Sequence, residues 1–153
     1  MKLAINTSVQ PNAASQYLLI LVDSEHVQNA ATPYQINDLD SHIEATQFKA
    51  ALNESLALVG SVAACRNSAL LGLGKVSELQ VNKLAKIAQT IIKASQKKFQ
   101  HISVDISALP QEQHYLFALS LTQAAYAFDE YKSKKNEFAL TQIDLIAAKT
   151  SLS

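Results

Sequence analysis

Hydrophobic residues occur along the chain in short continuous runs and in helical stripes. The clearest run, residues 17–22, is closed by the polar residues Asp23, Ser24 and Glu25. Six apolar residues are too few for a helix and suit a strand buried on both faces of a sheet. We therefore predict the first central strand here, followed by a polar loop over residues 26–40.

The next segment predicts a short helix and then a pair of strands. Ser41 and Glu44 have the spacing of a capping box at a helix start. Apolar residues follow at helical spacing, namely Ala45, Phe48, Ala51 and Leu52. Two apolar runs, residues 56–59 and 69–71, are separated by a short polar turn. We predict that these runs are adjacent strands that form a hairpin.

The strongest helical pattern lies between residues 78 and 98, where two stripes recur with a period near 3.6. Ser77 and Gln80 have capping spacing, so we predict a helix from about Glu78 to Lys98. The apolar stripe consists of Leu84, Ile87, Ala88, Ile91, Ile92, Ser95 and Phe99. The polar stripe, called the lysine stripe below, consists of Lys83, Lys86, Thr90, Lys93 and Lys97.

The last third of the chain predicts a strand, a helix and a final strand. Residues 101–106 alternate between polar and apolar, which is typical of a strand with one covered face. Pro110 suits the first turn of a helix that ends in a polar turn over residues 132–136. Residues 138–146 predict the final strand. The inner face of the helix would consist of Phe117, Leu121, Ala124, Ala125 and Phe128.

The predicted order of elements is β, α, β, β, α, β, α, β, without an internal repeat. This alternation indicates a three-layer α/β fold with a mixed sheet flanked by helices. A chain of 153 residues can bury one sizeable core, so we expect residues 1–153 to form a single domain. Only 17% of the residues are charged, which suggests that a partner covers part of the surface.

Charge and cysteine content argue against several classes of protein. The 13 basic and 13 acidic residues balance, and Arg66 is the only arginine, which disfavours sequence-specific binding of nucleic acid. Cys65 is the only cysteine, so neither an internal disulfide nor a cysteine-based zinc site fits one chain. No apolar run approaches about 18 residues, and we expect a cytoplasmic protein without membrane contact.

Side chains capable of chemistry do not form a catalytic pattern. The histidines lack the spacing of metal ligands, and Cys65 lacks a local signature of a nucleophile. The adjacent acids Asp129 and Glu130 would point about 100° apart on a helix, so they cannot face one substrate. We therefore predict no catalytic, cofactor-binding or metal-binding residue. The four histidines are His26, His42, His101 and His114.

For two segments the sequence allows either a binding role or a purely structural role. Residues 72–75, Gly-Leu-Gly-Lys, join a predicted strand to a helix, but lack the spacing of known phosphate-binding loops. We favour a strand-to-helix hinge there. The lysine stripe, with Lys132, Lys134 and Lys135 near the next helix end, suits a salt-sensitive contact with DNA or an acidic partner. We favour a solvated face.

Two segments together resemble a known family. Residues 70–75, Leu-Leu-Gly-Leu-Gly-Lys, lead through Glu78 and Leu79 into a long helix. Residues 124–135 contain a Tyr-Ala-Phe segment followed by Tyr-Lys-Ser-Lys-Lys. Both segments resemble the N-terminal domain of the leucyl aminopeptidases, or cytosol aminopeptidases, of peptidase family M17. The resemblance covers residues 17–146, and the second segment is its more specific part.

The resemblance implies a cytoplasmic, usually hexameric metalloaminopeptidase that removes N-terminal residues from peptides with two divalent ions, zinc or manganese. The metal-binding and catalytic residues of the family lie in a C-terminal domain. None of its motifs occurs in this sequence, so no catalytic residue carries over. Residues 61–67 depart from the family pattern, because they lack the expected turn rich in glycine and proline.

The leading hypothesis is therefore a noncatalytic N-terminal domain, similar to the macrodomain fold, with an interaction or regulatory role. In the family this domain packs outward from the catalytic core and shapes assembly and access, and in some bacterial members it helps the hexamer bind DNA. One alternative is a macrodomain-like module that binds a nucleotide or ADP-ribose at residues 72–75. The other is nonspecific DNA binding through the lysine stripe.

Overall fold

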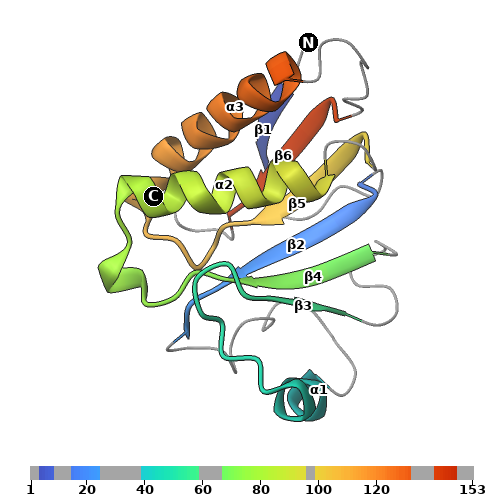
Figure 1. Ribbon diagram of the computed structural model, residues 1–153, viewed down its shortest axis with the longest axis vertical. Coiled ribbons are helices and arrows are strands. Elements are labelled where there is room, and N and C mark those ends of the chain that lie inside the picture. The colour runs from blue at the N-terminus through green and yellow to red at the C-terminus, as the bar shows by residue number, and fades with distance from the viewer. Residues whose placement is uncertain are drawn as a thin grey trace.

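The computed structural model describes residues 4–8, 15–24, 39–58, 67–95, 99–131 and 140–147. Its sheet has the strand order β1-β6-β5-β2-β4-β3, and only β3 runs antiparallel to its neighbour (Figure 1). The strands are β1 (Ala4–Ser8), β2 (Tyr17–Val22), β3 (Ser55–Ala57), β4 (Asn67–Gly72), β5 (His101–Asp105) and β6 (Gln142–Ile146). The helices are α1 (Leu39–Thr46), α2 (Val81–Ser95) and α3 (His114–Tyr131). The predicted α/β fold with a mixed sheet is confirmed.

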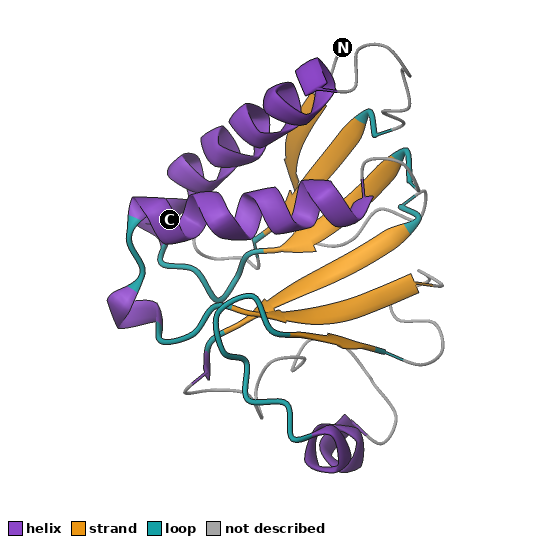
Figure 2. Ribbon diagram, in the orientation of Figure 1, coloured by secondary structure: helices purple, strands orange, loops and turns teal. Residues whose placement is uncertain are grey.

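Strand β2 is buried on both faces, as its continuous apolar run predicts. Leu19 and Leu21 belong to the large core cluster under α2 and α3. The alternate residues Leu18 and Ile20 belong to a second cluster on the other face, against which Ile43 of α1 packs. Figure 2 shows α2 and α3 side by side in front of the sheet, with α1 beyond the β3 edge. The sheet is therefore the middle of three layers.

The predicted order of elements is wrong at its start, because it omits strand β1. It pairs only with β6, at one edge of the sheet, in a parallel register that aligns Ile5 with Ile143. Its sequence, AINTS, contains Ile5 as the only large apolar side chain. Such a short edge strand needs only one inward residue, so it shows no alternation that sequence reading can detect.

Strand β5 does not have the one covered face that its alternating pattern predicts. Besides its apolar residues, Ser103 and Asp105 are buried, with exposed fractions of 0% and 4%. The hydroxyl of Ser103 forms a hydrogen bond with the hydroxyl of Ser15. The carboxylate of Asp105 accepts a hydrogen bond from the backbone, since Ser107 N–H donates to Asp105 Oδ1 at 2.9 Å. Polar residues are tolerated here because they have partners.

Asp144 on β6 is the centre of a polar network on the same sheet face. Its carboxylate accepts hydrogen bonds from His101 Nε2 at 2.8 Å and from Gln142 Nε2 at 3.0 Å. Burial by itself raises the pKa of Asp144, but these two hydrogen bonds, the charge of His101 and a bond from Asn6 outweigh it. The pKa of Asp144 therefore lies below its ordinary value, and the carboxylate is ionised near neutral pH.

Helix α1 ends earlier than the sequence predicts. Ser41 lies inside it rather than at its N-cap, and Phe48 lies beyond its last residue, Thr46, although Phe48 is buried as expected. Gln47 has a φ of 59°, and the bonds from Phe48 N–H to Ile43 O and from Gln47 N–H to Glu44 O close the end. This is a Schellman motif with glutamine at the position where glycine is usual.

Replacing Gln47 by glycine is expected to stabilise the protein by about 0.5–1 kcal/mol, because glycine adopts positive φ without the Cβ clash. The midpoint of urea unfolding measures the gain. Gln47→Ala is the matched control, since it removes the same exposed side chain but keeps the Cβ. Equal midpoints for the two variants would contradict the strain argument.

The starts of α2 and α3 also differ from the prediction. A 3₁₀ turn, Val76–Glu78, contains Ser77, and α2 begins at Val81, so the predicted capping pair does not cap the helix. Pro110 precedes a second 3₁₀ turn, Gln111–Gln113, rather than lying in the first turn of α3. Each 3₁₀ turn takes up residues that periodicity alone assigns to the helix.

The buried faces of both helices and the hairpin are as predicted. All six α2 residues of the apolar stripe are buried, as are Phe117, Leu121, Ala124 and Ala125 on α3. β3 pairs antiparallel with β4, with Leu56 opposite Leu70. The side chain of Phe128, the polar turn at 132–136, residues 59–66 and residues 138–139 lie outside the described residues. Across the described ranges, no helix combines the length and apolar character needed to cross a membrane.

Candidate functional site

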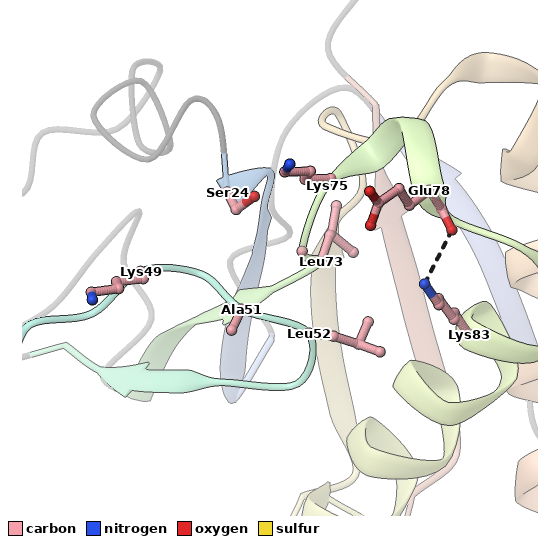
Figure 3. Close-up of a pocket in the computed structure, with 9 residues that line it drawn as sticks. Ser24, Lys49, Ala51, Leu52, Leu73, Lys75, Glu78 and Lys83 are labelled. Carbon is pink, nitrogen blue, oxygen red and sulfur yellow. Dashed lines mark hydrogen bonds between the residues drawn. The ribbon is translucent and has the colours of Figure 1, made fainter.

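A cleft of about 410 Å³ opens where β2 and β4 end. The carboxyl ends of parallel strands are the usual place for ligands in α/β sheets. Figure 3 shows Lys75, Glu78 and Lys83 on one side of the cleft, Leu52 and Leu73 between, and Lys49 extending away on the other side. The lining consists of Ser24, Lys49, Ala51, Leu52, Leu73, Gly74, Lys75, Glu78 and Lys83.

The two glycines beside this cleft are required by the backbone. A Cβ on Gly72 would lie 2.2 Å from the carbonyl oxygen of Ala51, closer than any real contact. A Cβ on Gly74 would make only ordinary contacts with Leu52, but its φ of 69° is unfavourable for other residues. One glycine therefore permits a close approach of two backbone segments, and the other permits a left-handed turn.

Three of the four amides of residues 72–75 already donate to backbone carbonyls. Gly72 N–H donates to Glu54 O at 2.7 Å, and Leu73 N–H donates to Val22 O at 2.8 Å. Gly74 N–H donates to Ala50 O at 2.9 Å. A phosphate-binding loop needs free N–H groups directed at the ligand. These bonds support the interpretation of residues 72–75 as a strand-to-helix hinge.

The opposite wall of the cleft is a turn, residues 47–54, fixed by one carboxylate. Glu54 Oε1 accepts the N–H groups of Lys49 at 3.1 Å and of Ala51 at 3.0 Å. Ala50 and Asn53 have φ of 58° and 66°, and Ala50 is fully buried. Non-glycine residues keep such angles only where their surroundings hold them. The wall is therefore preformed.

The charges of the cleft suit weak electrostatic contact rather than chemistry. Lys83 Nζ donates to the backbone oxygen of Glu78 at 3.3 Å, which turns one ammonium group towards the protein. Lys49 and Lys75 are exposed and lie on opposite sides (Figure 3). The three ammonium groups do not converge on one point. The lining holds one carboxylate, one serine and no histidine or cysteine, so no nucleophile is paired with a base.

His101 and His114, the two histidines whose side chains the structure describes, lie outside the cleft. His101 binds Asp144, and His114 Nε2 is 3.1 Å from the carbonyl oxygen of Leu109. Both have protein partners, as a structural role requires. Within the described ranges, no group of three or more His, Cys, Asp or Glu residues is arranged to hold a metal ion. His26 and Cys65, with the side chains of His42, Asp129 and Glu130, are outside the described residues.

The lysine stripe lies on the outer side of α2. Lys86 and Lys93 are exposed and Lys83 is half-buried, while the apolar stripe of the same helix faces the core. This is the arrangement of a solvated amphipathic helix. Lys97, Lys132, Lys134 and Lys135 fall outside the described residues.

A second hollow, of about 290 Å³, lies at the opposite ends of β2 and β4 and was not predicted. The rings of Tyr17 and Phe99 stack there with centroids 5.0 Å apart and planes 5° from parallel. Burial raises the pKa of Tyr17. Phe99 belongs to the predicted apolar stripe, and nothing in the sequence places its ring next to the first residue of a distant strand.

Comparison with protein families gives one match over most of the chain. The N-terminal domain of the cytosol aminopeptidase family matches residues 20–135. Among curated proteins, a probable cytosol aminopeptidase of Acinetobacter baumannii is 59% identical over 99% of this chain. One of Acinetobacter baylyi is 51% identical over the same share. The chain spans 32% of the length of each of these relatives.

Solved structures share the fold at low sequence identity. A mutant of tomato leucine aminopeptidase matches 98% of this chain and 33% of its own, with a TM-score of 0.66 and 15% identity. The bottromycin maturation enzyme BotP, in complex with Mn, matches 88% of this chain and 27% of its own, with a TM-score of 0.59 and 14% identity. At such identities the likeness shows the fold alone.

Proposed function

Because this chain belongs to the cytosol aminopeptidase family, peptidase family M17, as an N-terminal domain, we propose that it serves a metalloaminopeptidase without performing the reaction. Residues 1–153 form a single noncatalytic domain. The parent enzyme is cytoplasmic and removes N-terminal amino acids from peptides. This domain contributes to assembly, to active-site access or to partner binding.

One observation carries the proposal: 99% of the chain aligns at 59% identity with one third of a protein named as an aminopeptidase. The remaining two thirds of that relative are where the resemblance locates the catalytic domain. The site chemistry agrees with this division, because the cleft beside β2 and β4 pairs no nucleophile with a base.

The metal ions of the proposed parent enzyme belong to that other domain. The described residues do not fit a metal centre, since they contain no cluster of potential ligands. We therefore assign no catalytic, cofactor-binding or metal-binding residue to this chain. Two divalent ions, zinc or manganese, are expected in the catalytic domain.

The purified 153-residue chain is expected to show no turnover of leucine p-nitroanilide with added Mn²⁺. The full-length Acinetobacter baumannii relative, assayed at the same molar concentration, is the positive control. Mixing it with an excess of the 153-residue chain checks that the preparation contains no inhibitor. Turnover by the chain alone, at a rate that co-purifies with the protein, would contradict the noncatalytic role.

The two alternatives differ in their structural support. Nucleotide or ADP-ribose binding at residues 72–75 has less support, because three of the four amides of that loop donate to backbone carbonyls. Contact with DNA keeps some support, because Lys86 and Lys93 are exposed along one side of α2. It stays a prediction, and the assembly role does not depend on it.

A further inference from the structure

The cleft at the ends of β2 and β4 has an apolar floor between cationic sides. Leu73 is 1% exposed and Leu52 packs against the same core cluster, so the floor is a fixed hydrophobic surface. Figure 3 shows Lys75 and Lys49 on opposite sides of this floor. The volume of about 410 Å³ lies in the usual range for small-molecule sites, about 300–1,000 Å³. The floor and the charges together restrict which ligands fit.

The balance of charge in the cleft selects an anion. Three lysines and one glutamate line it, which gives three positive charges against one negative charge. Within the described part of the chain, neither Lys49, Lys75 nor the carboxylate of Glu78 takes part in an ion pair. Their charges therefore act on a molecule that enters the cleft rather than on each other. A cation would be repelled by this lining, whereas an anion would be attracted.

The same lining disfavours compact and multiply charged anions. A phosphate needs several donors that converge on it, but the amides of Gly72, Leu73 and Gly74 donate to backbone carbonyls. The ammonium groups of the cleft do not converge either (Figure 3). A second negative charge on the ligand would meet the carboxylate of Glu78. The ligand that fits best therefore carries one delocalised charge and a small hydrophobic group.

One end of the cleft offers donors for a single carboxylate. Ser24 follows β2 and Lys75 follows β4, and the bond from Ser24 N–H to Gly74 O, at 2.9 Å, holds the two segments together. Among the residues that the structure describes, neither the Ser24 hydroxyl nor the Lys75 ammonium has a hydrogen-bond partner. Both groups are donors, and one carboxylate has two oxygens to accept from them. The apolar floor lies beside this end of the cleft.

We propose that the cleft binds a monocarboxylate joined to a branched apolar group. Lys75 and Ser24 hold the carboxylate, and Leu52 and Leu73 contact the apolar group. This is the chemistry of a peptide C-terminus that ends in leucine, isoleucine or valine, and also of a free N-acylated amino acid. All the binding groups belong to this chain, so binding goes beyond the proposed function and requires no catalytic domain. Because the cationic groups are exposed to solvent, we expect a dissociation constant in the millimolar range.

A titration of the isotope-labelled 153-residue chain with N-acetyl-L-leucine, followed by nuclear magnetic resonance, tests the site. The blocked amino group of this probe excludes it as an aminopeptidase substrate. We expect saturable shifts of the amides of residues 49–52 and 73–75, and a dissociation constant that rises with salt concentration. N-acetyl-L-leucinamide lacks the charge and N-acetylglycine lacks the branched group. Each of these two matched ligands should bind several-fold more weakly.

Substitutions assign the roles of the two charged side chains. Lys75→Met is expected to weaken the binding of N-acetyl-L-leucine about threefold, because it removes the ammonium group but keeps a long side chain. Lys86→Met is the matched control, since Lys86 is exposed on α2 and does not line the cleft. N-acetyl-L-glutamate should bind the wild type more weakly than N-acetyl-L-leucine, and Glu78→Gln should narrow that difference. Circular dichroism confirms that the variants are folded.

A longer probe separates the two sources of the ligand. Acetyl-alanyl-leucine extends the probe on its amino side, as a peptide does, and keeps the same carboxylate and side chain. Binding as tight as that of N-acetyl-L-leucine identifies a peptide C-terminus. Clearly weaker binding identifies a free acid of the size of one residue.

Several outcomes would overturn the proposal. The absence of saturable shifts would do so, as would equal binding of N-acetyl-L-leucinamide or equal affinities of Lys75→Met and Lys86→Met. Competition by inorganic phosphate at equal affinity would identify a general anion site and contradict the preference for a carboxylate. Turnover of leucine p-nitroanilide by the chain would contradict the proposed function instead, and would leave the titration result as it is.

Discussion

Gly72→Ala is expected to destabilise the protein by about 3 kcal/mol or more, seen as a large fall in the midpoint of urea unfolding. The added Cβ would lie 2.2 Å from Ala51 O, 2.4 Å from Ala50 C and 2.6 Å from Ala50 O. These are backbone atoms of the turn that Glu54 holds, so they cannot move aside as a flexible side chain would. Relief of the clash requires β4 and this turn to separate, which breaks the bond from Gly72 N–H to Glu54 O.

Gly74→Ala is the matched control for this prediction. The nearest atom to its added Cβ is Leu52 N at 3.5 Å, so only the left-handed backbone opposes the change. We expect a cost of about 1–2 kcal/mol. Urea unfolding, followed by far-ultraviolet circular dichroism, measures both variants. If Gly74→Ala were the more destabilised of the two, the close packing of the turn on β4 would be wrong.

Asp144→Asn is expected to destabilise the protein at neutral pH by about 1–3 kcal/mol. His101 and Gln142 both donate to the wild-type carboxylate, whereas asparagine offers one acceptor oxygen and turns an NH₂ group towards a donor. Because the site is buried, water cannot replace the lost acceptor. The free energy of unfolding from urea titrations of both proteins gives the difference.

The pH dependence of this difference has a definite sign. The pKa of Asp144 is lowered in the folded protein, so the unfolded chain binds the proton first as the pH falls. The stability that ionised Asp144 contributes is fully present above its unfolded pKa of about 3.9. It is lost as the pH falls through the lower folded pKa. The wild type should therefore lose its advantage over Asp144→Asn below about pH 4, and a constant difference down to pH 2 would contradict this account.

The parts of the fold that the sequence predicts are those where one local pattern decides the outcome. The run in β2 predicts a strand buried on both faces, because six consecutive apolar residues leave no side for water. The inner face of α2 follows from its period, since the sheet covers one side of the helix. Residues 70–75 and 124–135 also predict the family, which the match to residues 20–135 confirms.

The parts that the sequence does not predict depend on distant contacts. Phe48 fits a helical spacing behind Ser41, but a left-handed turn at Gln47 redirects it into the core. Polar residues on β5 suggest solvent, but Ser103 and Asp105 have partners that come from other segments or from the following turn. No local pattern reports such partners.

The candidate site shows the same division. The hinge role of Gly72 and Gly74 is predictable, because glycines between a strand and a helix have few other uses. The cleft itself is not, since Lys49, Lys75 and Lys83 line one cleft only when the turn at 47–54 folds against the end of β4. One wall of the cleft depends on Glu54, whose carboxylate accepts hydrogen bonds from two backbone amides. The sequence does not predict these bonds.

The two edge strands of the sheet offer little for the addition of further strands. An open sheet can grow by adding strands at its edges, which is a common route to aggregation. Here one edge is β3, which is only three residues long, and the other is β1, which carries mostly small and polar side chains. Neither offers a long, flat, apolar template. Pairing between the sheets of two copies is therefore disfavoured at both edges.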